Sequence, residues 1–329
     1  MTARARFAPR DGSRRRGWVY AGLAAFLVVD VLLVSWAISA VSASNEPTEQ
    51  PREVSITAPQ ASPAPPRDDA DSDSDTDGAA DAPTAVPPSR LLAAVDGSTA
   101  WRATTGECGV ATAAPEVTTD AGTSWATTDA STETGVTALL RLVPASAEVA
   151  SFVGLAQNDC TPIAVRTFVG GGDYAIDPAG VASTWHVDPS DRSAVVSPAG
   201  AVDAPCDTVV DLAARNADEA AVLCDDGAVS VTDDAGTSWA TPRVFDGAIA
   251  LTRSDEGWTI AAVGSDDCAG VEITAVTDAL APGAIGCLPL DQPAADLPGS
   301  VALSAADGTL WVWTDEGMAR STDGGASWL

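Results

Sequence analysis

The hydrophobic pattern of residues 90–329 is that of short strands separated by tight turns. Runs of Val, Leu, Ile and Ala alternate with small residues, and turn signals come about every 8 to 12 residues. Residues 91–125, 208–239 and 301–328 share one order: an apolar run, an acidic or glycine turn, a second apolar run, and a third that ends in Trp. The pattern predicts an all-β domain built from repeated units.

An eight-residue phrase, hydroxyl-x-Asp-x-Gly-x-Ser-Trp, ends each of these three units. Its Asp can accept hydrogen bonds from loop amides, its Gly tolerates a positive φ, and its Trp can pack against a neighbouring unit. The phrase therefore predicts a self-locking turn with a structural role. Its copies are Thr118, Asp120, Gly122, Ser124 and Trp125; Thr232, Asp234, Gly236, Ser238 and Trp239; and Ser321, Asp323, Gly325, Ser327 and Trp328.

The phrase resembles the Asp-box of the BNR-repeat β-propellers, a family that includes sialidases, sortilin-type receptors and photosystem II stability and assembly factors. The resemblance implies a ring of four-stranded blades, with the box between the third and fourth strands and away from the central site. Successive boxes are 114 and 89 residues apart, and each interval fits two blades. With degenerate copies at 177–185 and 277–283, we expect about five blades in a propeller domain over 90–329. Ring closure depends either on a shortened outer strand or on the segment before Ser89.

The N-terminal region predicts a membrane anchor. Residues 1–17 contain six Arg and one Asp, and residues 18–41 are mostly apolar and long enough to cross a bilayer. The charge bias predicts a cytoplasmic tail at 1–17, a single transmembrane helix at 18–41, and an extracellular C-terminal propeller. Two alternatives are a signal peptide cleaved near Ala43 and a twin-Arg export signal, although Gly17 stands where the latter has Phe. Asp30, within the span, is expected to be tolerated there.

Residues 42–89 are rich in Pro, Ala, Ser, Thr and Asp, which predicts a disordered linker. Five Asp alternate with small residues between Asp69 and Asp77, as in a calcium-binding loop. The twelfth position of that loop is Thr84, where the loop requires a bidentate Glu, so an acidic spacer is the better interpretation.

The chain has a net charge of −29 and contains no Lys, a composition that suggests a GC-rich coding bias such as that of actinobacteria. So acidic a chain is not expected to bind nucleic acid. Its six Cys, all beyond the predicted membrane span, favour disulfides. Strand positions favour the pairs Cys206–Cys224 and Cys268–Cys287, which leaves Cys108 with Cys160. We expect neither a metal site nor a cofactor, because the chain lacks CxxC and has a single His, His186.

The resemblance also raises sialidase chemistry, in which an Arg triad grips the substrate carboxylate beside a Tyr nucleophile, its Glu partner and an Asp acid. Here the only Tyr beyond the predicted span is Tyr174, and the Phe-Arg-Ile-Pro phrase of sialidases is missing. Three Arg on adjacent predicted strands could converge at the axis: Arg102, Arg141 and Arg166. The scarce Glu fall on predicted turns or a strand (Glu148, Glu256 and Glu272), and a Ser-His-Asp site would have to use His186 without a nucleophile elbow. We therefore expect no catalytic residues.

What remains is a binding module whose loops carry the function. The longest predicted loops are 126–136, 168–184, 188–206 and 288–300, and they are poor in aromatic residues. The sequence predicts a noncatalytic propeller, displayed on the membrane, that binds or scaffolds an unknown envelope protein or glycan. The alternatives are a sialidase-like glycoside hydrolase and an assembly factor, although the photosystem assembly factors use Arg-rich surfaces that this chain lacks.

Overall fold

The computed structural model describes residues 83–329. The predicted cytoplasmic tail, the transmembrane helix at 18–41 and residues 42–82 of the predicted linker lie outside the described residues. Within residues 83–329, no helix has the length and apolar character needed to cross a bilayer.

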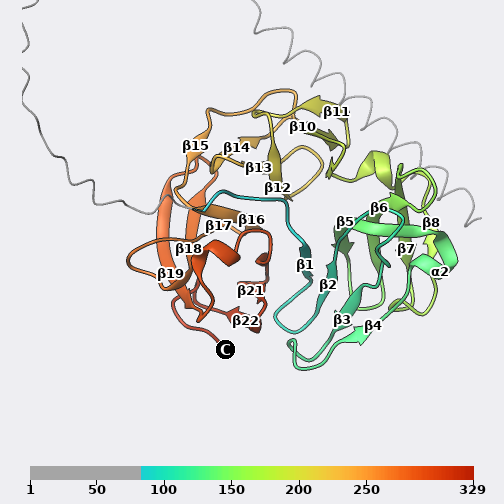
Figure 1. The fold of residues 1–329 in the computed structure, drawn as a ribbon, viewed down its shortest axis with the longest axis horizontal. Coiled ribbons are helices and arrows are strands. Elements are labelled where there is room, and N and C mark those ends of the chain that lie inside the picture. The colour runs from blue at the N-terminus through green and yellow to red at the C-terminus, as the bar shows by residue number, and fades with distance from the viewer. Residues whose placement is uncertain (1–82) are drawn as a thin grey trace, which may run out of the picture. The chain divides into compact units, whose positions relative to one another are not determined.

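The described residues form an all-β propeller of six blades, arranged around a central axis (Figure 1). The expectation of about five blades is therefore wrong by one. The additional blade comes from residues 186–203, most of which the sequence suggested to be loop. All strand pairs within the blades are antiparallel, and blades follow one another in chain order.

The first three blades contain eleven strands. Blade 1 consists of β1 (Arg90–Ala94), β2 (Ala100–Thr104), β3 (Glu116–Thr118) and β4 (Ala126–Thr127). Blade 2 consists of β5 (Val136–Pro144), β6 (Ala150–Ala156), β7 (Pro162–Thr167) and β8 (Ala175–Ile176), preceded by the short helix α2 (Ser131–Thr134). Blade 3 consists of β9 (His186–Asp188), β10 (Asp191–Ser197) and β11 (Gly200–Asp203), preceded by the 3-10 turn η1 (Val181–Ser183).

The other three blades also contain eleven strands. Blade 4 consists of β12 (Val209–Ala214), β13 (Ala220–Cys224), β14 (Ala228–Thr232) and β15 (Arg243–Val244). Blade 5 consists of β16 (Ala248–Ser254), β17 (Gly257–Ala262), β18 (Gly270–Thr277) and β19 (Pro282–Pro289). Blade 6 consists of β20 (Ala302–Ala306), β21 (Thr309–Thr314) and β22 (Gly317–Ser321), preceded by the 3-10 turn η2 (Ala294–Asp296).

The hydrophobic core lies between adjacent blades, because each sheet buries both of its faces against its neighbours. One apolar cluster joins Leu223 of blade 4 to Ile260 of blade 5, and another joins Ile273 of blade 5 to Val312 of blade 6. Trp101 of β2 and Trp311 of β21 are fully buried. Their indoles donate to a carbonyl in the first turn of the following blade, Trp101 to Ser146 at 2.9 Å and Trp311 to Asp96 at 3.1 Å.

Blade 3 lacks an inner strand. Trp185, just before β9, donates to the carbonyl of Asn216 at 3.0 Å, in the first turn of the following blade. Trp101 of β2 and Trp311 of β21 donate to the same place in the blades that follow them. The strand β9 thus corresponds to the second strand of the other blades. Elsewhere the first strands of neighbouring blades contact each other, whereas β9 lies between β5 and β12. Five inner strands and β9 therefore surround the axis.

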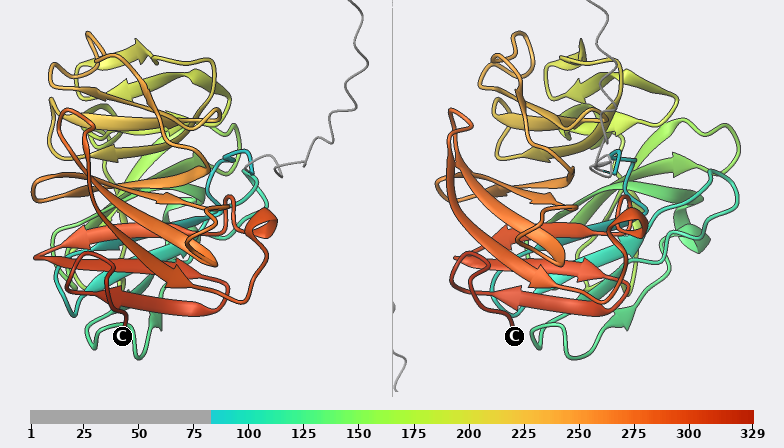
Figure 2. Two further views of the ribbon diagram at one scale, coloured as in Figure 1. Left: turned by 90° about the vertical axis from the view of Figure 1, so that its left-hand side faces the viewer. Right: turned by 60° about the vertical axis from the view of Figure 1, so that its left-hand side comes forward.

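The ring closes by side-by-side contact of blades 6 and 1. Strand β20 lies beside β1, and Ser304 Oγ accepts a hydrogen bond from the Ala94 amide at 2.8 Å. Backbone bonds between Arg320 and Leu329 add one residue pair beyond β22, where a fourth strand would begin. Residues 83–89, within the predicted linker, also contact the ring: Ala85 is buried, and the Ser89 amide donates to the Gly299 carbonyl at 2.7 Å. Figure 2 shows this segment, in cyan, on one face of the ring.

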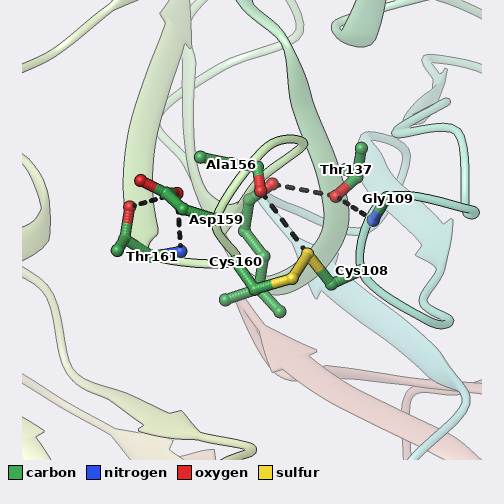
Figure 3. Close-up of a disulfide and its surroundings, with 8 residues drawn as sticks. Cys108, Gly109, Thr137, Ala156, Asp159, Cys160 and Thr161 are labelled. Atoms are coloured by element: carbon green, nitrogen blue, oxygen red, sulfur yellow. Dashed lines mark hydrogen bonds between the residues drawn. A yellow bond between two sulfur atoms is a disulfide. The ribbon is translucent and has the colours of Figure 1, made fainter.

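Three disulfides occupy that same face. They join Cys206 to Cys224 and Cys268 to Cys287, the two pairs favoured from strand positions, and Cys108 to Cys160, the pair that remained. The first links the β2–β3 loop of blade 1 to the β6–β7 loop of blade 2, and beside it the Gly109 amide donates to Thr137 Oγ1 at 3.2 Å (Figure 3). We call this the disulfide face, which carries the connections between second and third strands and between blades. The opposite end, with the turns between first and second and between third and fourth strands, is the turn face.

Candidate functional site

The repeated Asp-Gly-Trp turn has the same hydrogen bonds in its three copies. In the first, Asp120 accepts from the Thr118 hydroxyl at 2.8 Å, from the Ser124 amide at 2.9 Å and from the Ser124 hydroxyl at 2.6 Å. The copies at Asp234 and Asp323 have the same bonds to their own hydroxyl and Ser residues. The three turns lie on the turn face, and each Asp is engaged in its own turn. This geometry gives them a structural role.

Each turn also packs against the preceding blade. The Trp239 indole donates to the carbonyl of Asp203 in blade 3 at 3.0 Å, and the Trp328 indole donates to that of Cys287 in blade 5 at 2.7 Å. The turn glycine has a left-handed backbone, with φ of +84° at Gly236, and an added Cβ would lie 2.6 Å from Val202 of blade 3. Glycine is therefore required both by conformation and by close approach.

The degenerate copies lie partly elsewhere than expected. In blade 2 the equivalent turn is 167–174, where Thr167 Oγ1 accepts from the Gly171 amide at 3.0 Å as Thr118 Oγ1 does from Gly122 at 3.1 Å. Residues 177–185, expected to hold this copy, instead connect blades 2 and 3. Residues 277–283 do span the turn between β18 and β19. The prediction failed at 177–185 because Asp177 pairs with Arg166 of blade 2, whereas Trp185 donates to Asn216 of blade 4, so the two do not share one turn.

A cavity of about 550 Å³ lies on the axis of the ring. The first strands of five blades and β9 line it, together with Pro87, Pro88 and Ser89 at the disulfide face. Because blade 3 has no inner strand, side chains from β9 and β10 reach the cavity. Its charged lining consists of five Arg and one acid: Arg90, Arg141, Arg192, Arg215, Arg253 and Asp211.

This lining reverses the charge of the rest of the molecule, since residues 83–329 contain 34 acidic residues and nine Arg. Arg90 pairs with Asp315, and Arg215 pairs with Asp278 at 2.7 Å. Within residues 83–329, no carboxylate lies within ion-pair distance of the other three, Arg141, Arg192 and Arg253. The cavity therefore has an excess of positive charge.

Two of these arginines are fixed by backbone carbonyls. Arg141 Nη1 donates to the Leu212 carbonyl at 2.7 Å, which joins β5 to β12 across the place of the missing strand. Arg192 Nη1 donates to the Val209 carbonyl at 2.8 Å. Burial lowers the pKa of both guanidinium groups, yet arginine stays charged at neutral pH. The remaining N–H groups of each fork are free to bind an anion.

Asp211 lies among these arginines but forms no ion pair with any of them. Its carboxylate accepts from the backbone amides of Leu212 and Leu251, both at 2.8 Å. Burial raises the pKa of this carboxyl group. The two hydrogen bonds and the charges of Arg141 and Arg192 act in the opposite direction, but the pKa remains raised. The carboxylate therefore ties β12 to β16 and reduces, but does not cancel, the positive charge.

His186, the first residue of β9, lines the same cavity and is 1% exposed. Its Nδ1 lies 2.8 Å from the Thr184 carbonyl, so Nδ1 carries the proton and Nε2 is a hydrogen-bond acceptor. No donor in the described part of the chain reaches Nε2. Burial lowers the pKa of the imidazole, and nearby Arg141 lowers it further. A neutral, buried acceptor thus stands beside the arginines.

The predicted arginine triad does not form. Of its members only Arg141 lines the axial cavity, whereas Arg102 pairs with Glu116 at 2.6 Å and Arg166 with Asp177 at 3.4 Å. Both belong to strands that do not face the axis. The sequence analysis missed Arg192, Arg253 and Asp211, and it gave His186 no place at the axis. The missing inner strand of blade 3 explains why residues 186 and 192 face the axis.

Tyr174 does not reach the axis. It lies in the turn of blade 2, where its hydroxyl is 2.6 Å from Thr128 Oγ1, and its ring packs at a tilt against that of Phe152, with the ring centres 6.0 Å apart. Burial raises its pKa to about 12, so the phenol is protonated at neutral pH. Tyr174 is therefore neither ionised nor close to the clustered arginines, as a sialidase nucleophile would be.

The chain matches no protein-family model, and none of the curated proteins matches it. Among solved structures, YCF48 bound to D1 peptide is similar over 74% of this chain and 82% of its own, with 16% identity and a TM-score of 0.41. YCF48 from Cyanidioschyzon merolae matches at 13% identity and a TM-score of 0.38, covering 74% of this chain and 85% of that one. The six-bladed fucose-recognising lectin of Aleuria aurantia matches at 9% identity and a TM-score of 0.45, covering 75% and 96%. Similarities this low say nothing about the ligand of this chain.

Proposed function

We propose that this chain is a noncatalytic binding module that takes an anionic group of an envelope protein or glycan into its axial cavity. The observation that carries the proposal is the charge reversal: within residues 83–329, five of the nine arginines but only one of the 34 acidic residues line a cavity at the centre of an acidic ring. Folding a chain so as to gather like charges costs free energy, which binding of an anion recovers.

The hydrogen-bonding groups of the cavity favour a ligand with a carboxylate and, next to it, a hydroxyl or amide that can donate a hydrogen bond. Arginine forks match the two oxygens of a carboxylate, and Arg141 and Arg192 are already oriented by Leu212 and Val209. The unpaired Nε2 of His186 would accept a hydrogen bond from an adjacent hydroxyl or amide of the ligand. Both uronic acids and the acidic ends of peptides contain this combination.

Two pairs of probes that differ only in charge test the proposal: D-glucuronate beside D-glucose, and acetyl-leucine beside its amide. We expect the charged member of at least one pair to bind the full chain in calorimetric titrations, and its neutral counterpart not to bind. Arg141→Gln should weaken binding about tenfold or more, because a hydrogen bond to a charged group contributes about 1.5–3 kcal/mol. The matched control is Arg243→Gln on the outer strand β15, which should bind as the parent does.

Equal binding of charged and neutral probes, or equal losses in the two variants, would contradict an anion site on the axis. If only glucuronate binds, the target is a glycan acid; if only acetyl-leucine binds, it is a peptide. The described residues give the sialidase-type alternative no support, because Tyr174 and the axial arginines belong to different regions.

The proposed attachment of this module to the membrane is based on the sequence, since residues 1–82 lie outside the described residues. We propose that residues 18–41 anchor the chain in the cell membrane and that the propeller is extracytoplasmic, as the flanking charge and the disulfides favour. We also propose that the repeated turns are Asp-boxes of the BNR type, on the basis of their shared hydrogen bonds. Protease treatment of intact cells should remove the propeller and leave residues 1–17 protected; full protection of the propeller would contradict this topology.

A further inference from the structure

A second cavity, of about 390 Å³, lies on the turn face between blades 4 and 5. Arg215 and Glu219 come from the first turn of blade 4, Asp233 and Ser238 from its repeated turn, and Trp258 and Asp278 from blade 5. Arg215 also borders the axial cavity, but the other five residues do not. We call this the interblade pocket.

Two residues that line this pocket, Trp258 and Arg215, each hold a buried donor that has no acceptor among the described residues. The Trp258 side chain is 2% exposed, and its indole Nε1 has no hydrogen-bond partner among the described residues. The same is true of Arg215 Nε, whose guanidinium lies 4.7 Å from the centre of the Trp258 ring. The comparable indoles of Trp101, Trp185 and Trp311 all donate to carbonyls.

Trp258 lacks such a carbonyl because it turns the other way. It packs with Leu223 and Val229 of blade 4, in the preceding sheet, whereas Trp101 and Trp311 bond to the blade that follows them. Leaving an N–H buried and unpaired costs about 1–3 kcal/mol, and phenylalanine would fill this space without that cost. The retained N–H groups therefore point to a bound acceptor.

The other groups of the pocket exclude charged ligands. Glu219, Asp233 and Asp278 give it three carboxylates against the single charge of Arg215, so an anion would be repelled. A cation offers only donors and could satisfy neither Trp258 Nε1 nor Arg215 Nε. A hydroxyl group both accepts and donates, so it can take the two N–H groups and donate to a carboxylate.

We infer that the interblade pocket is a binding site for a neutral sugar, independent of the anion site on the axis. One hydroxyl accepts from Trp258 Nε1 and Arg215 Nε, and its neighbours donate to Glu219 and Asp278. The apolar side of the ring lies against Val231, which also lines the pocket. The pocket volume accommodates one monosaccharide unit, at the end of a chain or as a branch.

The test uses full chain labelled at the tryptophan indoles and four methyl glycosides as probes, those of mannose, glucose, galactose and fucose. The Trp258 indole signal is identified by its loss in Trp258→Phe. We expect at least one glycoside to shift this signal in a saturable manner. Sodium acetate and methylammonium chloride serve as anionic and cationic probes and should leave the signal in place.

Affinity for that glycoside, measured by saturation-transfer difference spectra, should fall about three- to tenfold in Trp258→Phe and in Glu219→Gln, as expected for loss of one hydrogen bond between neutral or singly charged groups. Asp225→Asn, an exposed acid in the opposite β13–β14 turn, should bind as the parent does. Arg141→Gln should also leave sugar binding unchanged, which separates this site from the axial one.

Three results would overturn the inference. No glycoside shifts the Trp258 signal; acetate or methylammonium shifts it and the glycosides do not; or affinity is the same in the parent, Trp258→Phe and Glu219→Gln. Should Trp258→Phe fail to fold, Glu219→Gln together with Asp278→Asn decides the outcome, since both carboxylates lie at the solvent edge of the pocket.

Discussion

At the scale of single residues, the aspartates of the repeated turn act as ionised acceptors. Hydrogen bonds from the Ser124 hydroxyl and amide, and from the Thr118 hydroxyl, lower the pKa of Asp120 to about 2. The equivalent groups of the third turn, the Ser327 hydroxyl and amide and the Ser321 hydroxyl, lower the pKa of Asp323 to about 2. The pKa of Asp234 is lowered as well, first by the Ser238 amide. The charged form of each carboxylate is therefore part of the folded turn.

Replacing Asp120 with Asn should lower the melting temperature at neutral pH by a few degrees, because the turn loses an ionised acceptor of three hydrogen bonds. The folded pKa is about 2 and the ordinary value 3.8, so this stabilisation is complete above about pH 4 and disappears as pH falls toward 2. Melting curves of parent and variant should converge over that interval. The matched control is Asp233→Asn, which replaces an exposed acid beside the second turn.

His186 offers a direct measurement at the axis, because it is the only histidine and its ring signals need no assignment. Burial and Arg141 lower its pKa below 6.5 in the folded protein. Since the unfolded chain takes up the proton first, this residue should make the protein less stable as pH falls below 6.5. An NMR titration should give a midpoint below 6.5 that rises in Arg141→Gln and rises again when an anion binds. A midpoint at or above 6.5 without ligand would contradict the placement of His186.

At the scale of elements, neighbouring blades are held together where a turn glycine approaches the preceding sheet. Gly236→Ala should be destabilising for two reasons: a left-handed Ala costs about 1–2 kcal/mol, and its Cβ would meet Val202 at 2.6 Å. Relief of that overlap should cost about 1–3 kcal/mol more. The comparison variant is Gly308→Ala, at φ +70° with no atom within 4 Å of the added Cβ.

Urea unfolding of both variants separates the two contributions. Gly308→Ala reports the backbone cost alone, and the additional loss in Gly236→Ala reports contact between blades 3 and 4. Equal losses in the two variants would show that the turn does not press on blade 3.

The repeats predicted the fold class but not the number of blades. Blades 1, 4 and 6 each have a turn with Asp, Gly and Trp after the third strand, so each is visible in the sequence. Blade 3 has neither an inner strand nor such a turn, and β10 begins with the polar residues Asp191, Arg192 and Ser193. A polar strand that faces a cavity has the composition of a loop, and only the packing of Trp185 identifies it.

The same missing strand explains why the axial site was only partly predicted. Arg141 could be proposed from sequence because it lies on a first strand. Arg192 lies on a strand that would be shielded from the axis in a complete blade. Which strand of a blade is innermost depends on its neighbours, and a single sequence does not contain that information.

At the scale of the whole molecule, a disulfide constrains the unfolded chain more strongly when it closes a longer loop, although the effect grows only with the logarithm of loop length. Cys108 and Cys160 are 52 residues apart and join two blades, whereas the other pairs are 18 and 19 apart. Replacing Cys108 and Cys160 with Ser should cost about 4 kcal/mol, and replacing Cys206 and Cys224 about 3 kcal/mol. Urea unfolding of the two double variants measures both losses. A larger loss for the shorter loop would indicate that local packing, and not chain entropy, determines the contribution of each disulfide.

The disulfides and the hydrogen bonds of the ionised aspartates lie on different faces of the ring. All three disulfides lie on the disulfide face, and the three repeated turns, with their ionised aspartates, lie on the turn face. A reductant and a strong acid should therefore weaken opposite sides of one molecule. Limited proteolysis would then cut near residues 105–115 and 264–269 after reduction, but near 119–124 and 233–238 in acid. Each treatment should therefore leave the bonds of the other face intact, and blade 4 carries both kinds, the Cys206–Cys224 disulfide and the Asp234 turn.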